Sequence, residues 1–151
     1  MPPNPDCIFC KIIAGRAEAT FLLREPKVAA FLDVFPWVPG HTLVVPRRHL
    51  AGLAELTPQI GGLMMAAGRQ VAAALRRTLP RCEGVNFFLA DGAVAGQTVF
   101  HCHLHVIPRS AADGFGIRRP AVPPPSRDEL EERAVRLRAA LASPPSRRTR
   151  R

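Results

Sequence analysis

The chain carries three of its five histidines at alternate positions in one stretch, Gln97-Thr98-Val99-Phe100-His101-Cys102-His103-Leu104-His105-Val106-Ile107-Pro108-Arg109. Strict alternation predicts a β-strand, because successive side chains leave a strand on opposite faces. The three imidazoles would then share one face, and the apolar residues Cys102, Leu104 and Val106 would share the other. Pro108 would end the strand, since proline cannot donate to a sheet ladder. A row of imidazoles turned away from a core has to meet something polar, such as a metal, an anion or a substrate.

Length and composition indicate one globular domain. The chain has 151 residues, of which 47% are hydrophobic, and its formal net charge is +9. We expect the domain to span residues 1–142 and a disordered basic tail to span 143–151. A basic body favours anionic substrates by electrostatic steering, whereas nucleic acid is not expected as a partner. The sequence has no membrane-spanning apolar run and no export signal, which predicts a cytoplasmic protein with no membrane partner.

A second group of candidate residues begins with Cys7 and Cys10, spaced C-x-x-C. Two thiolates at this spacing are half of a tetrahedral zinc site, and His49 and His101 could supply the other half. Such a site has no open position and would be structural. The alternative is a pair of free thiols. If zinc holds His101, that side chain cannot also bind phosphate.

Periodicity and turn signals predict an α+β fold. We expect a short helical turn over residues 7–14, strands over 21–24, 28–33, 41–46 and 84–90, and the histidine strand as the fifth. Thr57-Pro58 is a strong helix start, and the helix would run to Leu79 with Leu63, Met64, Val71 and Leu75 as its core face. Ser126-x-x-Glu129 is a capping box that would open a C-terminal helix. The fold is therefore expected to be an antiparallel five-stranded sheet with a long helix after the third strand and another helix at the end.

The chemistry of the central stretch favours phosphoryl transfer. Imidazole attacks phosphorus near neutral pH and is a good leaving group afterwards. Gly96 lets backbone N–H groups approach an anion closely, and Gln97 and Thr98 add donors beside them. Placed directly before three histidines on one face, this loop predicts a phosphate site.

At this point the residues resemble a known family. Residues 96–107, GQTVFHCHLHVI, are similar to the signature of the histidine-triad superfamily of nucleotide hydrolases and transferases. The blocks FLD at 31–33 and PGHTLVVPRRH at 39–49 resemble that family's nucleoside-binding half, and the resemblance covers roughly residues 7–109. It implies a histidine-triad-like α+β fold and a homodimer built through the long helix, which would leave Met64 and Met65 near an interface.

The resemblance also implies catalytic roles. His103 matches the nucleophile, which takes the α-phosphate of a nucleotide as a covalent nucleotidyl intermediate that water then hydrolyses. His105 matches a residue that hydrogen-bonds the α-phosphate. His41 matches an outlying histidine that supports the triad, and His101 matches the triad's first histidine, which serves zinc in similar bacterial proteins. This chemistry requires no catalytic metal.

Nucleotide contacts follow from the same resemblance. Asp33 matches a residue at the ribose hydroxyls, and Phe31 and Val34 would line the base pocket. Gln97 and Thr98, after Gly96, match phosphate and leaving-group contacts. The expected substrates are purine nucleotide conjugates, of adenosine above all, either phosphoramidates or dinucleoside polyphosphates.

The chain departs from the family pattern at Ala90, where Asn or Gln is usual, and alanine offers no side-chain hydrogen bond. This departure favours an alternative function, a nucleotide-binding sensor or interaction protein with little turnover. A third interpretation is a metal-dependent enzyme that uses the histidines as ligands, but it leaves the phosphate-type loop unexplained.

Overall fold

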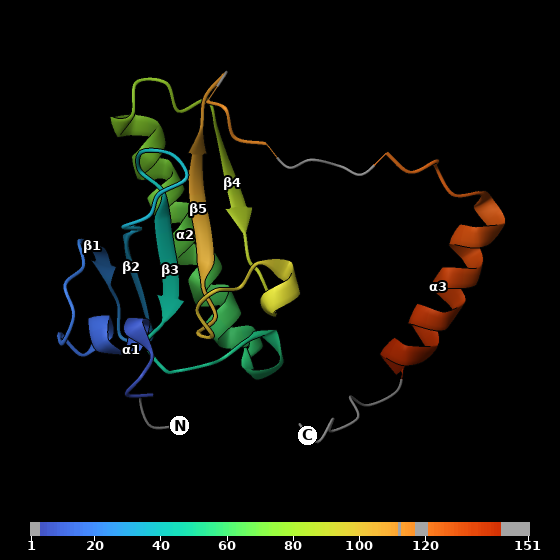
Figure 1. Ribbon diagram of the computed structural model, residues 1–151, viewed down its shortest axis with the longest axis horizontal. Coiled ribbons are helices and arrows are strands. Elements are labelled where there is room, and N and C mark those ends of the chain that lie inside the picture. Colours follow the sequence, from blue (N-terminus) through green and yellow to red (C-terminus); the bar gives the residue numbers. More distant parts are fainter. Residues whose placement is uncertain (1–3, 112, 117–120, 143–151) are drawn as a thin grey trace. The chain divides into compact units, whose positions relative to one another are not determined.

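The computed structural model describes residues 4–111, 113–116 and 121–142. The protein consists of two compact units, Met1–Phe115 and Gly116–Arg151. The first unit holds one antiparallel sheet with the strand order β1-β2-β3-β5-β4 (Figure 1). Its elements are α1 (Ile8–Ile13), β1 (Phe21–Arg24), β2 (Val28–Leu32), β3 (Thr42–Pro46), the 3-10 turn η1 (Leu53–Glu55), α2 (Pro58–Thr78), β4 (Gly84–Phe88), the 3-10 turn η2 (Ala93–Ala95) and β5 (Leu104–Arg109). The predicted α+β fold with five antiparallel strands is confirmed.

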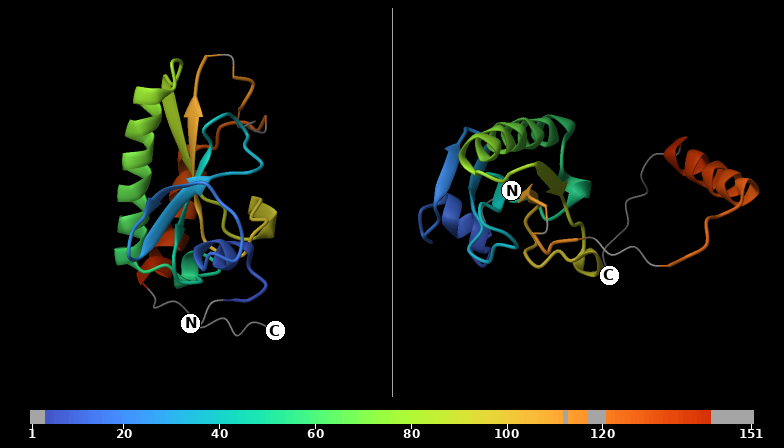
Figure 2. Two further views of the ribbon diagram at one scale, coloured as in Figure 1. Left: turned by 90° about the vertical axis from the view of Figure 1, so that its left-hand side faces the viewer. Right: turned by 90° about the horizontal axis from the view of Figure 1, so that it is seen from above.

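The sheet is covered on both faces, and this decides which way each histidine points. In Figure 2, left, α2 lies along one face, and α1 and η2 lie on the other side. Alternate strand residues pack toward α2, namely Val28, Ala30, Val44, Leu104 and Val106. Their neighbours pack toward α1, namely Ala29, Phe31, Leu43 and Val45. His105 pairs with Leu43 across β3 and β5, so its side chain lies on the α1 side of the sheet.

Helix α2 begins and packs largely as the sequence predicts. The Thr57 hydroxyl accepts a hydrogen bond from the Ile60 N–H at 3.3 Å, with Pro58 at the first helical position. The buried stripe of the helix consists of Met64, Ala67, Gly68, Val71 and Leu75. Leu63 was wrongly predicted to be core, since it is 38% exposed. Met64 is 2% exposed and belongs to the core, so of the two methionines only Met65 is available for an interface.

Strand β5 differs from its prediction at both ends. It begins at Leu104, because the Cys102 N–H donates to the Leu50 carbonyl at 2.6 Å, outside the sheet. It continues through Pro108, which pairs with Val85 of β4, so the expectation that Pro108 ends the strand is wrong. The pairing with β3 stops at Val106. Pro108 therefore lies where β5 has a neighbour on one side only, and there a missing N–H is tolerated.

The second unit contains α3 (Arg127–Ala142), which opens with the predicted capping box. The Ser126 N–H donates to Glu129 at 2.7 Å, and the Glu129 N–H donates to the Ser126 hydroxyl at 3.2 Å. The single domain over residues 1–142 stays a prediction, and residues 143–151 lie outside the described part. Among the described residues, no helix is both long and apolar enough to cross a membrane.

Candidate active site

His103 is held so that one ring nitrogen is free. Its Nδ1 lies 2.7 Å from the backbone carbonyl oxygen of His101. A carbonyl only accepts, so Nδ1 carries the proton, and Nε2 is left with a lone pair in the neutral ring. The ring is buried and packs edge-on against Phe9 of α1, with ring centres 5.3 Å apart. Its Nε2 is therefore a candidate nucleophile with a fixed tautomer.

His105 is oriented by a second histidine, His41, which directly precedes β3. The Nε2 of His41 lies 2.9 Å from the Nδ1 of His105. The backbone N–H of Trp37 donates to the Nδ1 of His41 at 3.3 Å, so that nitrogen is an acceptor and the His41 proton sits on Nε2. His41 thus donates to His105, which must carry its own proton on Nε2. His105 presents an N–H donor beside the lone pair of His103, whose ring centre is 4.8 Å away.

Burial keeps these three histidines neutral. Desolvation lowers the pKa of His105 to about 4, with help from the neighbouring His103 and His41. Desolvation also lowers the pKa of His41 and of His103, against the opposing pull of Asp33, whose Oδ2 lies 3.4 Å from the Nδ1 of His41. At pH 7 the group consists of neutral rings with defined donors and acceptors.

A cavity of about 330 Å³ opens beside His103 and His105. It is mainly apolar, and α1, β2 and the loop after β2 supply most of its walls. Its residues are Ile8, Phe9, Ile12, Glu18, Ala19, Phe31, Leu32, Asp33, Val34, Phe35, Trp37, Leu43, Gly96, Thr98, Val99, His103 and His105. Of the predicted nucleotide-binding residues, Phe31, Asp33, Val34, Gly96 and Thr98 line it. An apolar chamber that ends in a few convergent polar groups suits a nucleoside attached to a phosphate.

Gln97 and Ala90 are not among the residues that line the cavity. The Gln97 amide bonds to backbone at both ends: its Oε1 accepts from the Gly92 N–H at 2.8 Å, and its Nε2 donates to the carbonyls of Ala51 at 2.7 Å and Val99 at 3.2 Å. In this structure Gln97 braces the loop, and a direct phosphate contact of its side chain stays a prediction. Ala90 is 2% exposed, so its methyl group is almost completely enclosed.

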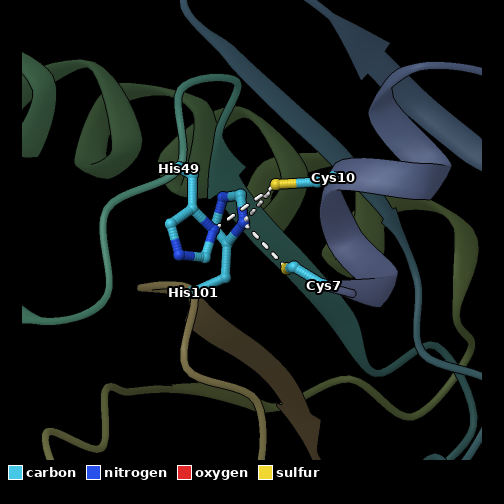
Figure 3. A group of neighbouring side chains, drawn as sticks. All are labelled: Cys7, Cys10, His49 and His101. Atoms are coloured by element: carbon cyan, nitrogen blue, oxygen red, sulfur yellow. Dashed lines mark hydrogen bonds between the residues drawn. The ribbon is translucent and has the colours of Figure 1, made fainter. Parts of the chain in front are cut away.

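The second cluster unites Cys7, Cys10, His49 and His101, whose ligand atoms all lie within 4.8 Å of one another. Figure 3 shows the two cysteines at α1 and the two imidazoles converging on a common point. The Sγ of Cys7 lies 3.4 Å from Nδ1 of His101, and the Sγ of Cys10 lies 3.4 Å from Nδ1 of His49 and 3.7 Å from Nδ1 of His101. Tetrahedral zinc, with bonds of about 2.3 Å to sulfur and 2.0–2.1 Å to nitrogen, requires sulfur–nitrogen distances of about 3.6 Å. The four side chains fit a zinc ion.

His101 turns Nδ1 to this cluster and Nε2 to the backbone. Its Nε2 lies 2.8 Å from the Pro46 carbonyl oxygen, so Nε2 carries the proton and Nδ1 is left free to bind a cation. Burial lowers the pKa of His101 to about 4, which keeps the ring in the neutral form that metals require. The structure brings His101 to the cysteines and leaves His103 and His105 at the cavity.

The sequence patterns missed several cavity residues. Phe9 contacts both His101 and His103, and Ile8 and Ile12 line the cavity from the same short helix. The predicted helical turn over residues 7–14 does not show what these apolar side chains pack against. Trp37 stacks on His105, with ring centres 5.1 Å apart, and no periodic pattern in the sequence marks it.

Comparisons with known proteins agree with this geometry. The HIT domain family matches residues 14–112. A HIT-like protein of Borreliella burgdorferi is 41% identical over 76% of this chain and 83% of its own, and an Arabidopsis thaliana protein named adenylylsulfatase HINT3 is 33% identical over 72% of this chain and 54% of its own. A crystallised HIT family member from Bacillus subtilis has a TM-score of 0.83 and 35% identity, covering 92% of this chain and 99% of that one. A zinc-bound histidine triad family protein from Mycobacterium smegmatis has a TM-score of 0.71 and 36% identity, covering 89% and 97%. The chain belongs to the HIT, or histidine triad, family.

Proposed function

We propose that the protein is a nucleotide hydrolase or transferase that cleaves the α-phosphate bond of purine nucleotide conjugates through a nucleotidyl-histidine intermediate. The observation that carries this proposal is the pairing of His103 Nε2, a lone pair, with His105 Nε2–H, a donor, at the end of the cavity. A nucleophile and an oxyanion donor beside each other are what attack on a phosphoryl group requires. Nucleotide hydrolases and transferases are what the resemblance to the histidine-triad family implies.

The cavity walls suggest how a nucleotide would lie. The apolar walls, which include Phe31 and Val34, suit a purine ring, and the Asp33 carboxylate has acceptor capacity for ribose hydroxyls. Gly96 and Thr98 line the same cavity as His103 and His105, and we assign them to the phosphate. The Arabidopsis relative, named an adenylylsulfatase, supports an adenylyl conjugate as the substrate. Competition between nucleoside monophosphates for one site would test the preference for adenosine.

The reaction would run in two steps. His103 Nε2 attacks the α-phosphorus, so that an N–P bond forms while the bond from phosphorus to the leaving group breaks, and the leaving group takes up a proton from solvent. Water then attacks the same phosphorus, the N–P bond breaks, and the proton that the water loses returns to solvent. The sum consumes one water and releases a nucleoside monophosphate and the protonated leaving group. His105 would donate to the phosphoryl oxygen throughout and stabilise its developing charge.

We propose zinc as the occupant of the four-residue cluster at Cys7, Cys10, His49 and His101. Four protein ligands leave zinc no open position, so its contribution would be structural: it would tie α1 to the segment after β3 and to the segment before β5. The Zn-bound relative from Mycobacterium smegmatis supports this assignment. The reaction above proceeds by a nitrogen nucleophile and needs no catalytic metal.

A homodimer and a cytoplasmic location remain part of the proposal. The outer face of α2 exposes Leu63 and Met65, at 38% and 52%, and Phe87 on edge strand β4 is 36% exposed. These apolar side chains suit a self-complementary contact between two copies. Light scattering would give the mass of a dimer for the parent and a smaller mass for Met65→Glu. A monomeric parent would contradict the dimer.

The alternative function, a nucleotide sensor with little turnover, is favoured by Ala90. This position is buried and offers no side-chain hydrogen bond to a leaving group. Calorimetry that finds nucleotide binding, together with no hydrolysis of any conjugate, would favour the sensor.

The proposed function is tested with an adenosine phosphoramidate and a dinucleoside polyphosphate. We expect the parent to release a nucleoside monophosphate from at least one of them, and His103→Ala to be slower by about 10³-fold or more. Mass spectrometry of protein quenched during turnover would find the nucleotidyl group on the peptide that contains His103. A variant as fast as the parent, or an adduct on another residue, would contradict the mechanism.

A further inference from the structure

The indole of Trp37 lies flat against His105. The two ring centres are 5.1 Å apart and the planes are within 9° of parallel. The same indole lies 5.2 Å from the ring of His41, at 31°, and 5.8 Å from Phe88 at the end of β4. Trp37 therefore covers both members of the His41–His105 pair.

A second set of residues also packs against the indole of Trp37. Phe115 stacks on Trp37 with ring centres 5.2 Å apart and planes at 19°. The guanidinium of Arg109 lies 4.6 Å from the centre of the Phe115 ring, and its NH2 group donates to the Phe115 carbonyl at 2.5 Å. Arg109, the last residue of β5, is itself fixed by Asp113 at 2.7 and 2.9 Å. Planar groups thus run from His105 through Trp37 and Phe115 to Arg109, and β5 supplies both ends.

Trp37 is also a wall between two cavities. It lines the chamber of about 330 Å³ that holds His103 and His105, and it lines a neighbouring one of about 460 Å³ beside Pro39, Leu79 and Pro108. Trp37 is 47% exposed, so its side chain contributes little to the buried core. Its contacts with His105 and His41 point to a role at the site.

We infer that Trp37 is a positioning residue that fixes the plane of the His105 imidazole; this inference rests on the proposed function. The hydrogen bond from His41 fixes one nitrogen of His105. Phe88 and His103 meet the ring at 48° and 62°, so the tilt of its plane keeps some freedom. A near-parallel indole on the ring face removes this freedom, because turning the imidazole would break the stack. With the plane fixed, Nε2–H points steadily at the α-phosphate. His103 is positioned separately, by the His101 carbonyl.

This inference is tested with Trp37→Ala, Trp37→Phe and the control Leu22→Ala. Leu22 lies on β1 and is 46% exposed, so the control removes a side chain of similar exposure that lines neither cavity. The backbone N–H of residue 37 still reaches His41 in every variant. We expect Trp37→Ala to lower kcat by about tenfold and to change the Kd for AMP by less than about threefold, because misalignment of His105 weakens the transition state more than nucleotide binding. Trp37→Phe keeps an aromatic face and should stay within about threefold of the parent, as should Leu22→Ala.

A measurement independent of turnover reads the stack itself. A ring proton of His105 under an indole experiences that ring's current, so its NMR resonance should move downfield in Trp37→Ala and much less in Trp37→Phe. Unchanged kcat together with an unmoved His105 resonance in Trp37→Ala would overturn the role of Trp37 alone. A parent that hydrolyses neither test substrate would overturn the proposed function, and with it the catalytic part of this inference.

Discussion

Two histidine clusters lie side by side in this molecule and behave differently, although one short stretch supplies residues to both. His101 joins Cys7, Cys10 and His49 in a closed set of four ligand atoms (Figure 3). His103 and His105, two and four residues later, border an open cavity. In the first cluster every ligand atom faces other ligand atoms. In the second, the free Nε2 of His103 borders the cavity. The role of a histidine here follows from what its two ring nitrogens meet rather than from its place in the alternation.

The two clusters also touch. The carbonyl of His101 accepts from the Nδ1 of His103, so the backbone of a residue in the metal cluster sets the tautomer of the proposed nucleophile. A metal ion in the first cluster would therefore stabilise the second without taking part in its chemistry.

The largest effect should come from removing one ligand of the closed cluster, which consists of Cys7, Cys10, His49 and His101. Cys7→Ser removes one thiolate, and we expect loss of the bound zinc and a fall in Tm of about 10 °C or more, as about 3 kcal/mol of metal-linked stability disappears. Elemental analysis and thermal unfolding measure both. Cys82→Ser is the matched control, since Cys82 lies outside the cluster and its Sγ only donates to the Gly84 carbonyl, which a hydroxyl can also do. A parent without metal, or a Cys7→Ser variant as stable as the parent, would break the contrast between the clusters.

A substitution in the open cluster, which consists of His41, His103 and His105, should lower the rate of hydrolysis without loss of zinc. His41→Ala takes away the donor that fixes the His105 tautomer, and we expect kcat to fall by about 10- to 100-fold. Zinc content should stay that of the parent, whereas Tm should fall somewhat because the substitution leaves a cavity at a buried position. If the variant loses zinc, the two clusters are one structural unit and the comparison above is wrong.

Acid should destabilise the fold through the open cluster. The pKa of His105 is lowered by burial from 6.5 to about 4 in the folded protein. Between these values the unfolded chain binds a proton that the folded chain does not, so the free energy of unfolding decreases as the pH falls from 6.5 to 4 and is at its full value above 6.5. At pH 4.5 this single group accounts for about 2 kcal/mol.

Urea unfolding of the parent and of His105→Asn at pH 7 and pH 4.5 measures this term. Asparagine can still accept from His41 but does not titrate, so the variant should lose about 2 kcal/mol less than the parent between the two pH values. Metal release in acid contributes to both proteins and cancels in the difference. Equal losses would mean that His105 is protonated as easily in the fold as in the unfolded chain.

The alternation of the central stretch predicted the correct faces but not the correct strand. Cys102, Leu104 and Val106 do pack into the core under α2, opposite the histidines. The strand begins late because the Cys102 N–H bonds to Leu50, a tertiary contact that no local pattern contains. The alternating pattern indicates which side of the chain is apolar, even at Cys102, which lies outside the hydrogen-bonded strand.

The parts of the site that the sequence could not predict come from segments far apart in the chain. The stack on His105 joins residues 37, 105 and 115, and neither a helical nor a strand period connects them. The metal cluster was predictable because its chemistry restricts the ligands: after a C-x-x-C pair, few histidines remained to complete it. Aromatic packing has no such restriction, since any planar residue can stack on any other.

The smallest effect should follow a swap of ligand type within the closed cluster. His49 faces the cluster with Nδ1, the ring nitrogen nearer to the backbone, so a cysteine at this position would place its sulfur in nearly the same direction. The zinc–sulfur bond, about 2.3 Å against 2.0–2.1 Å for nitrogen, offsets part of the shorter side chain. We expect His49→Cys to keep one zinc per chain, a Tm within about 5 °C of the parent and unchanged hydrolysis, measured as for Cys7→Ser. The same swap at His103 would replace the proposed nucleophile, and we expect it to stop turnover. A His49→Cys variant that loses its metal would mean that the first cluster depends on the shape of the imidazole as strictly as the second does.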